Sequence, residues 1–521
     1  MIKEFHIKIA GAKGEKYVYK HIKYFRNAEG APRNQSKAIG KYDLATGKMH
    51  PNANYFSLYH VNPSVPDVTV WDYGYTYLIC KICKDIGLWD DLYPVFGVQT
   101  MDIIVMASYI IREGNAMDGL EDWQQRNFFA GYHRNLTSQA VSRIFASITA
   151  EKRQAFFKQW VNSQLGEGCV CYDVTSISSY SAQMPQVERG YNRDGDDLSQ
   201  YNLGMFCNEE SRMPLYYNRY NGSLTDRTNL SYVLKNASEV GIHRVKMVLD
   251  GGFWSEECIQ SLDDFCESFT IGMPSYLKEA QHALSRCRHE IETFANEVPG
   301  FHIYCVQEAC EIYGVTGKIL VYYDPWNHVC QCNELSDYIR RLEKELQGFK
   351  RYPKSKLKRF LPYFDIVKHE SNNGFDFCIN MDKVDVLRRE KGCFFLFTTQ
   401  MDAEPGELLY YYRAKDADEK LFSQIKVDMD GARIRTHNEA TTDGKTFVTF
   451  IACIIRAYML NQLHQYMSRN STSMKKVFAQ LSNIMLISTT GNKHLAKALT
   501  KKQKEILSLF DADKDILRGI E

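Results

Sequence analysis

The order of apolar and polar runs between residues 166 and 274 constrains the fold of this 521-residue chain most strongly. Three short runs rich in β-branched and aromatic residues come first, at 169–180, 203–208 and 213–222. An amphipathic run at 224–241 and a second apolar run at 245–253 follow them. Three strands, a helix and a further strand in this order predict an α/β domain whose strands share one sheet.

Two aspartates stand at the ends of apolar runs in this segment. Asp173 follows the run CVCY, and Asp250 ends the run VKMVL, after which Gly251 and Gly252 let the backbone turn away. We expect both carboxylates on adjacent strands, where two buried charges require a cation and therefore indicate divalent-metal binding or acid/base chemistry. An Asp after a strand is also commonly a helix cap or a turn residue, and strand context alone leaves that alternative open.

A third acidic residue lies within the predicted helix YYYRAKDADEKLFSQIK (410–426). Five residues fall at spacings of three, four, three and four, which places them on one helix face: Tyr412, Lys415, Glu419, Phe422 and Lys426. Four of the five are polar or ionisable, so core packing explains the stripe poorly. Glu419 between two lysines suits a metal-binding carboxylate with cations for adjacent phosphates, although a solvated charged face is the alternative.

Composition and patterning predict several domains around this segment. Hydrophobic residues make up 44% and charged residues 24%, as in ordinary folded proteins. We expect a basic β-rich module at 1–60, a helical region at 61–165, a catalytic domain at 166–274 and 393–470, an insertion at 275–392 and a helical tail at 471–521. The insertion is predicted to hold a long polar helix (276–294) and strands, and the tail a basic helix (494–507).

Basic segments are local, because the whole chain carries a net charge of only +1. Residues 1–50 contain eleven Lys or Arg and four Asp or Glu, and residues 340–359 contain nine and two. Phosphate-backbone binding needs such patches, but a solvated face has the same composition. The amphipathic run at 136–148 predicts a helix that could enter a DNA groove with Ser138, Gln139, Ser142 and Arg143, or could simply pack.

The three acidic residues together resemble a known family. Asp173 in YDVTSISSY, Asp250 in VLDGGFW and Glu419 in its helix are similar to the DDE transposases of the insertion-sequence-four superfamily. The family signature is Tyr, two residues, Arg, three residues, Glu, six residues and Lys. Tyr412, Lys415, Glu419 and Lys426 match every interval. Lys415 replaces the usual Arg, which keeps the charge and loses the bidentate contact with phosphate.

The resemblance implies a ribonuclease H-like catalytic domain interrupted by a mixed, β-containing insertion and preceded by a β-rich and helical DNA-binding region. It implies an enzyme of a mobile element that binds terminal inverted repeats and target DNA, acting as a dimer on paired ends. Asp173, Asp250 and Glu419 would hold two Mg²⁺ or Mn²⁺ ions about 4 Å apart for strand cleavage and strand transfer. The residues expected to contact DNA are Tyr412, Lys415, Lys426, Arg143, Lys350, Arg351 and Lys354.

Two other functions compete with this hypothesis: a catalytically inactive DNA-binding remnant, and a metal-independent carboxylate hydrolase. Basic patches and the lysines beside Glu419 disfavour the hydrolase. Fifteen cysteines without regular spacing, and a start (MIKEFHIKIA) without the apolar core of a signal peptide, predict a reducing cytoplasm. The resemblance implies that this is the cytoplasm of a prokaryotic cell. The most apolar run, 448–460, is shorter than a membrane span and contains Arg456, so we expect a buried helix and no membrane partner.

Overall fold

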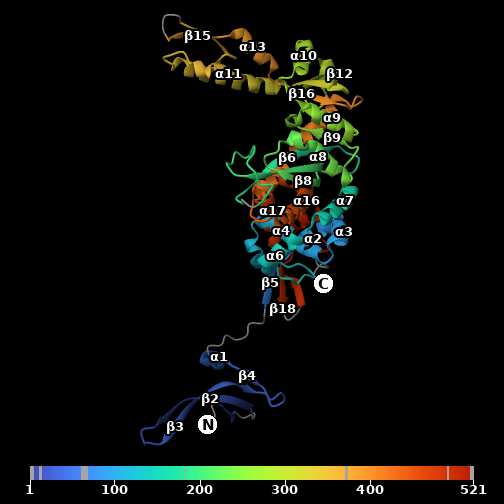
Figure 1. Cartoon of the computed structure of the whole chain (residues 1–521). Coiled ribbons are helices and arrows are strands. Elements are labelled where there is room, and N and C mark those ends of the chain that lie inside the picture. Colours follow the sequence, from blue (N-terminus) through green and yellow to red (C-terminus); the bar gives the residue numbers. More distant parts are fainter. Residues whose placement is uncertain are drawn as a thin grey trace. The chain divides into compact units, whose positions relative to one another are not determined.

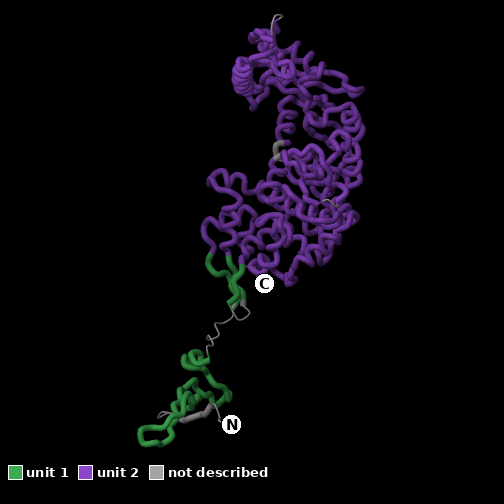
Figure 2. Tube along the Cα trace, turned by 60° about the vertical axis from the view of Figure 1, so that its left-hand side comes forward, with its two compact units in different colours: residues 1–71, 485–498, 520 green, residues 72–484, 499–519, 521 purple. Residues whose placement is uncertain are grey.

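A computed structural model describes residues 5–10, 15–59, 68–181, 184–369, 373–489 and 492–516, with the backbone alone at 5–10, 15, 416–419, 489 and 492. The chain forms two compact units (Figure 2). Unit 1 comprises residues 1–71 and 485–498, and unit 2 comprises residues 72–484 and 499–519. Figure 1 labels the helices and strands of both units.

Unit 1 consists mainly of β-structure. Its four-stranded antiparallel sheet has the order β1 (Phe5–Ala10), β2 (Glu15–Arg26), β3 (Pro32–Tyr42) and β4 (Met49–Pro51), and α1 (Ala53–Tyr59) follows. A second sheet has the order β19 (Asn492–Leu495), β18 (Met485–Thr489) and β5 (Val68–Asp72). The prediction of a basic helix from residue 494 was wrong in its first part, because that segment extends the β18–β19 hairpin and is helical only in α18 (Lys501–Ser508).

Helices at the start of unit 2 pack around one long buried helix, α16 (Glu439–Arg469). They are α2 (Gly74–Asp85), α3 (Leu88–Phe96), α4 (Gln99–Glu113), α5 (Leu120–Arg126), α6 (Ser138–Ser147) and α7 (Ala150–Gln164), and α17 (Met474–Ser482) follows α16. By length and apolar composition α16 could cross a membrane, but 78% of its most apolar window is buried inside this fold. Its buried Arg456 pairs with Asp428, which offsets the cost of burying a guanidinium.

The centre of unit 2 is a mixed sheet whose strands run in the order β11-β12-β13-β16-β10-β9-β6-β7-β8, with β17 also paired to β6. The strands predicted from the sequence are β6 (Val170–Ser179), β7 (Gln200–Asn208), β8 (Pro214–Asn221), β9 (Lys246–Leu249), β13 (Val315–Tyr323) and β16 (Cys393–Thr398). The other strands are β10 (Ser268–Met273), β11 (Glu297–Val298), β12 (Ile303–Ile312) and β17 (Arg433–Ile434). The predicted helix at 224–241 is α8 (Asp226–Glu239), and α9 (Glu256–Phe265) connects β9 to β10.

The segment expected as an insertion divides into two parts. Its first part adds β11, β12 and β13 to the central sheet, and the long polar helix predicted there is only α10 (Lys278–Cys287). Its second part has a small core of its own, which includes Leu342, Phe360 and Phe364. The elements around this core are α11 (Pro325–Gln347), α12 (Leu357–Phe360), β14 (Phe364–Lys368), β15 (Phe375–Ile379) and α13 (Met381–Glu390).

Phe447 joins α16 to the helices around it, and its truncation tests this core. Its ring is fully buried and lies 5.3 Å from the ring of Phe96 on α3 and 5.2 Å from that of Phe156 on α7. Phe447→Ala should lower the free energy of unfolding by about 3–5 kcal/mol, because it leaves a cavity among these rings. Urea denaturation followed by circular dichroism measures this loss. A change within about 0.5 kcal/mol, as expected for a surface control such as Lys158→Ala, would show that the rings do not form a shared core.

Candidate functional site

Parallel pairing of β6 and β9 brings Asp173 and Asp250 together, as predicted. Tyr172 lies opposite Leu249 in the register of the two strands, and the aspartates are the next residues along each chain. Both carboxylates therefore leave the same face of the sheet. Asp173 is the one residue of β6 that is not fully buried, so the face opens where its side chain lies.

The Asp173 carboxyl is held in a partly desolvated position. The backbone N–H of Val174 donates a hydrogen bond of 2.8 Å to its Oδ1. Burial raises the pKa of Asp173 from 3.8 to about 6, and the charge of Asp250 adds to this rise, while the Val174 N–H, Lys415 and Arg193 oppose it. The neighbouring cations Lys415 and Arg193 therefore favour the ionised form of Asp173.

Lys415 supplies positive charge to both aspartates. Its side chain is 8% exposed, and its Nζ lies 3.0 Å from Oδ1 of Asp250. Burial alone would raise the pKa of Asp250, but the Lys415 charge and hydrogen bond, with smaller contributions from Gly251 and Tyr412, lower it overall. Burial would likewise lower the pKa of Lys415, and the charges of Asp250 and Asp173 raise it instead. The structure thus brings the predicted Lys415 to the carboxylates.

Tyr412 approaches the same aspartate because a glycine makes room for it. Its hydroxyl donates a hydrogen bond of 3.4 Å to Oδ1 of Asp250. A Cβ at Gly272 of β10 would lie 2.6 Å from this hydroxyl and 2.8 Å from the backbone nitrogen of Gly251. Any larger residue at position 272 would therefore displace either Tyr412 or the turn that carries Asp250.

The helix that carries Glu419 differs in part from the prediction. α14 (Pro405–Ala414) packs against β9 and β10, and α15 (Asp416–Ser423) packs against β6, the strand of Asp173. The side chain of Glu419 lies outside the described residues. Residues Gln424–Asp428 wind as a π-helix, so the predicted single α-helical stripe through Lys426 was wrong in its last turn. The wider turn changes the direction of Lys426 relative to α15.

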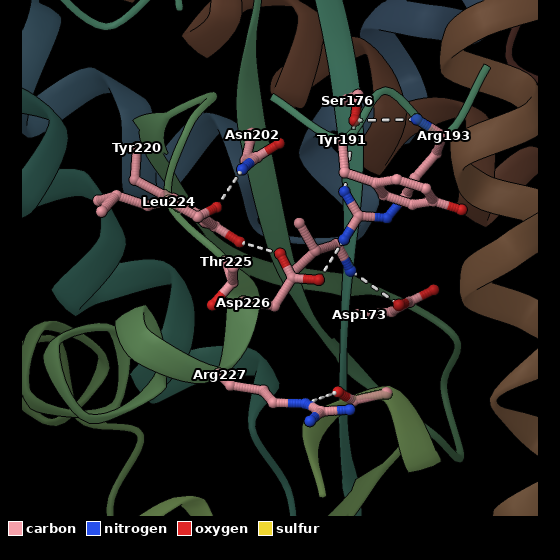
Figure 3. Close-up of polar contacts among 12 residues, drawn as sticks. Asp173, Ser176, Tyr191, Arg193, Asn202, Tyr220, Leu224, Thr225, Asp226 and Arg227 are labelled. Carbon is pink, nitrogen blue, oxygen red and sulfur yellow. Dashed lines mark hydrogen bonds and ion pairs between the residues drawn. The ribbon is translucent and has the colours of Figure 1, made fainter. Parts of the chain in front are cut away.

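Arg193, in the loop between β6 and β7, links β6, the strand that carries Asp173, to α8 (Figure 3). Its guanidinium forms an ion pair with Asp226, the first residue of α8, and donates a hydrogen bond of 3.3 Å to Ser176 of β6. The hydroxyl of Tyr220 donates a 2.6 Å hydrogen bond to the other oxygen of Asp226. Sequence analysis missed Arg193, because the polar loop YNRDGDD has the composition of an ordinary turn.

The next residue of α8 reaches the second carboxylate-bearing turn. Nε of Arg227 donates a hydrogen bond of 2.8 Å to the carbonyl oxygen of Gly252, two residues after Asp250 (Figure 3). Neighbouring residues Asp226 and Arg227 therefore contact the surroundings of both aspartates. The first turn of α8 thus holds β6 and the turn after β9 in position relative to each other.

The remaining residues predicted to contact DNA lie on several elements. Nζ of Lys426 lies 2.6 Å from a carboxylate oxygen of Asp194, in the same loop as Arg193. Arg143 is exposed on α6, beside the exposed Ser138, Gln139 and Ser142, while the opposite face of that helix is buried. Lys350, Arg351 and Lys354 are exposed on the segment after α11. Arg143, Lys350, Arg351 and Lys354 do not belong to the cluster around Asp173.

The donor set of the site suits a hard divalent cation. Mg²⁺ and Mn²⁺ prefer carboxylate oxygens, and Asp173 and Asp250 present theirs side by side at a position where burial disfavours an uncompensated charge. Among the side chains that the structure describes, no group of three His, Cys, Asp or Glu gathers around one point, but Glu419 is not among those side chains. The carboxylate oxygens of the two aspartates fit part of such a metal centre.

The raised pKa of Asp173 predicts a pH-dependent effect of Asp173→Asn. Because the folded-state value of about 6 exceeds the ordinary 3.8, wild-type stability should fall as pH rises between these values, by up to about 3 kcal/mol. Without divalent ions, Asp173→Asn should therefore melt at a higher temperature than wild type near pH 8 and at the same temperature near pH 4. Added Mg²⁺ should raise the melting temperature of wild type alone. Parallel pH profiles for the two proteins would refute the assigned electrostatics.

Comparisons with known proteins identify the family. The family described as Transposase DDE domain matches residues 164–455, which is more than half of the chain. No curated protein matches the chain. Among solved structures, a piggyBac transposase in a synaptic complex with hairpin DNA covers 85% of this chain and 83% of that chain at 11% identity and a TM-score of 0.35, too low a similarity to carry an argument. The matched segment contains Asp173, Asp250 and the helix of Glu419, and the chain belongs to the DDE transposase family.

Proposed function

We propose that this DNA transposase binds the terminal inverted repeats of an insertion sequence and moves the element by cut-and-paste transposition. The observation that carries this proposal is the parallel pairing of β6 and β9, which sets Asp173 beside Asp250 on the face where α15 packs. The intervals from Tyr412 to Lys426 support assignment to the insertion-sequence-four superfamily.

A ribonuclease H-like catalytic domain is the fold that we infer for the site. The strands β8-β7-β6-β9-β10 are neighbours in that order, the first two pairs antiparallel and the last two parallel. Helices α8 and α9 make the crossovers into β9 and β10. This arrangement supports the inference, because the three strands, the helix and the further strand expected along the chain form one sheet in which the strands before Asp173 and Asp250 are adjacent.

Asp173, Asp250 and Glu419 would hold two Mg²⁺ or Mn²⁺ ions. Such ions, when bound, activate water or a 3′-hydroxyl and stabilise the charge that develops on the phosphate during in-line displacement. Neighbouring residues set the charge and the orientation of these carboxylate ligands. Lys415 keeps Asp250 ionised, Tyr412 orients its carboxylate, and the charge of Arg193 favours the ionised form of Asp173.

The DNA partners would be the element ends and the target. Lys426 is placed to exchange its carboxylate partner, Asp194, for a DNA phosphate. The exposed Arg143, Lys350, Arg351 and Lys354 are suited to contacts with the phosphate backbone. Two ends must be held together for transposition, so we infer a dimer on paired ends, acting on DNA in the cytoplasm of a prokaryotic cell.

A catalytically inactive DNA-binding protein of the same fold is the second candidate. The observation that favours it is the buried ion pair of Lys415 with Asp250, at the position where the family signature has Arg. Cleavage of end DNA by the wild-type protein decides between the candidates, because the inactive form would bind the ends without cutting them.

Glu419→Gln tests the proposed third ligand. The wild-type protein should nick labelled DNA that carries the ends of the encoding element in the presence of Mg²⁺ or Mn²⁺. Glu419→Gln should slow nicking and strand transfer by at least about 100-fold, because the variant loses an anionic ligand where charge is stabilised, and should bind the ends with unchanged affinity. Glu407→Gln, on the preceding helix, is the matched control. Equal nicking by wild type and Glu419→Gln would exclude the assignment.

Asp226→Asn tests whether the first turn of α8 positions the carboxylates. Loss of the ion pair with Arg193 should slow cleavage by up to about 100-fold, as expected for a displacement on the order of 1 Å, and end binding should not change. The cleavage rate of the variant should also shift in its pH dependence, since Arg193 acts on the Asp173 pKa. Asp264→Asn, an exposed change on α9, is the control. A loss of thermal stability with no change in the pH profile would indicate a purely structural role.

A further inference from the structure

The outer part of the β2–β3 hairpin in unit 1 forms a two-stranded ribbon. β1 pairs with residues 15–20 of β2, and β4 pairs with residues 40–42 of β3. Residues 22–35, which we call the ribbon, lie beyond both partners, and among the described strands they pair only with each other. The sequence predicted strands in this region but gave no sign that they extend past their sheet.

The ribbon exposes large apolar side chains with no core beneath them. Every residue from 22 to 35 is exposed except Asn27, which lies in the turn closed by a hydrogen bond of 3.0 Å from its N–H to the carbonyl of Ala31. The exposed fractions are 45% for Ile22, 58% for Tyr24 and 45% for Phe25. Aromatic side chains exposed in this way on a thin projection mark a surface that a partner covers.

Each face of the ribbon carries the same kinds of side chains. Phe25 lies opposite Arg33, and Lys23 opposite Gln35, so these four share one face. Tyr24 lies opposite Asn34 and shares the other face with Arg26, whose guanidinium also bonds the Gly30 carbonyl at the tip. Each face thus offers an aromatic ring, a cation and a side-chain amide. Glu29 is the single acidic residue between positions 22 and 35.

We propose that the ribbon binds in the major groove of duplex DNA. The major groove accepts a two-stranded β-ribbon, and the cations on the two faces of this ribbon suit the phosphates that line the groove. Arg pairs with guanine edges and Asn or Gln with adenine edges, so the ribbon has groups for base recognition as well as for phosphates. The deep, narrow major groove of duplex RNA would exclude it.

This inference rests on the proposed function, since it names the surface by which a DNA transposase would grip its substrate outside the catalytic domain. A partner protein that docked on one face of the ribbon would leave the cations on the other face without an anionic partner. The charge on both faces therefore favours DNA over a protein occupant.

The test compares full-length wild type with a ribbon variant that carries Lys23→Gln, Arg26→Gln and Arg33→Gln. Binding of a labelled duplex that carries one end of the encoding element is measured over a range of salt concentrations. The ribbon variant should bind about 100-fold more weakly, and its plot of log affinity against log salt should become shallower by up to about three. A duplex RNA of the same sequence should not compete.

The matched control removes three exposed lysines of unit 2, Lys158, Lys235 and Lys502, by Gln substitution, so that net charge changes equally. It should bind DNA as wild type does. Arg26→Lys with Arg33→Lys should keep the salt dependence and lose discrimination between end and scrambled sequence. Unchanged affinity in the ribbon variant, an equal loss in the control or competition by duplex RNA would each overturn the proposal.

Failure of the ribbon proposal can be told apart from failure of the proposed function. If wild type cleaves element ends and the ribbon variant binds and cleaves equally well, the ribbon assignment falls while the transposase activity stands. If wild type never cleaves but the ribbon variant still loses duplex affinity and salt dependence, the ribbon assignment stands and the catalytic proposal falls.

Discussion

The burial of two carboxylates on neighbouring parallel strands is the constraint around which the site is built. Burial raises the pKa of Asp173 to about 6, and the charge of Asp250 adds to this rise. Two cations oppose it from different parts of the chain: Lys415 from the end of α14 and Arg193 from the loop between β6 and β7. Each cation is positioned by other contacts, Lys415 by a helix that lies across β9 and β10 and Arg193 by Asp226 of α8. The surrounding elements thus hold positive charge beside the carboxylates.

The strands that carry the carboxylates could be predicted because the sequence patterns that indicate them are local. β6 is apolar and buried except at Asp173, and β9 ends where Asp250 is followed by two glycines. Their adjacency followed from the order of elements, since a helix between two strands makes the crossover that parallel pairing requires. Intervals along the chain were sufficient to select Tyr412 and Lys415, and the structure brings both to Asp250.

Contacts between distant segments could not be predicted in the same way. Arg193 looks like part of a polar turn until its partner Asp226, 33 residues later, is placed beside it. The π-helix at Gln424–Asp428 interrupts a stripe that local spacing alone made continuous, and the N–H of Gly431 donates a hydrogen bond of 2.8 Å to the carbonyl of Ile425 within it. Strands β18 and β19 lie in the segment 471–521, which was expected as a helical tail, and β5, about 400 residues earlier, is the sheet neighbour of β18.

The ion pairs of the β6–β7 loop differ in how readily a phosphate could replace their carboxylates. Arg433 and Asp196 are both more than a third exposed, so water screens their attraction and the pair contributes little to stability. The side chain of Lys426 is less exposed, at 12%, but its partner Asp194 lies on the same loop as Asp196. One movement of this loop would therefore separate both ion pairs. The side chain of Lys415 is 8% exposed, and its carboxylate partner is Asp250 rather than a residue of the β6–β7 loop. Under the proposed function, DNA would therefore displace the acidic loop from Lys426 and Arg433, whereas Lys415 would remain with the carboxylates.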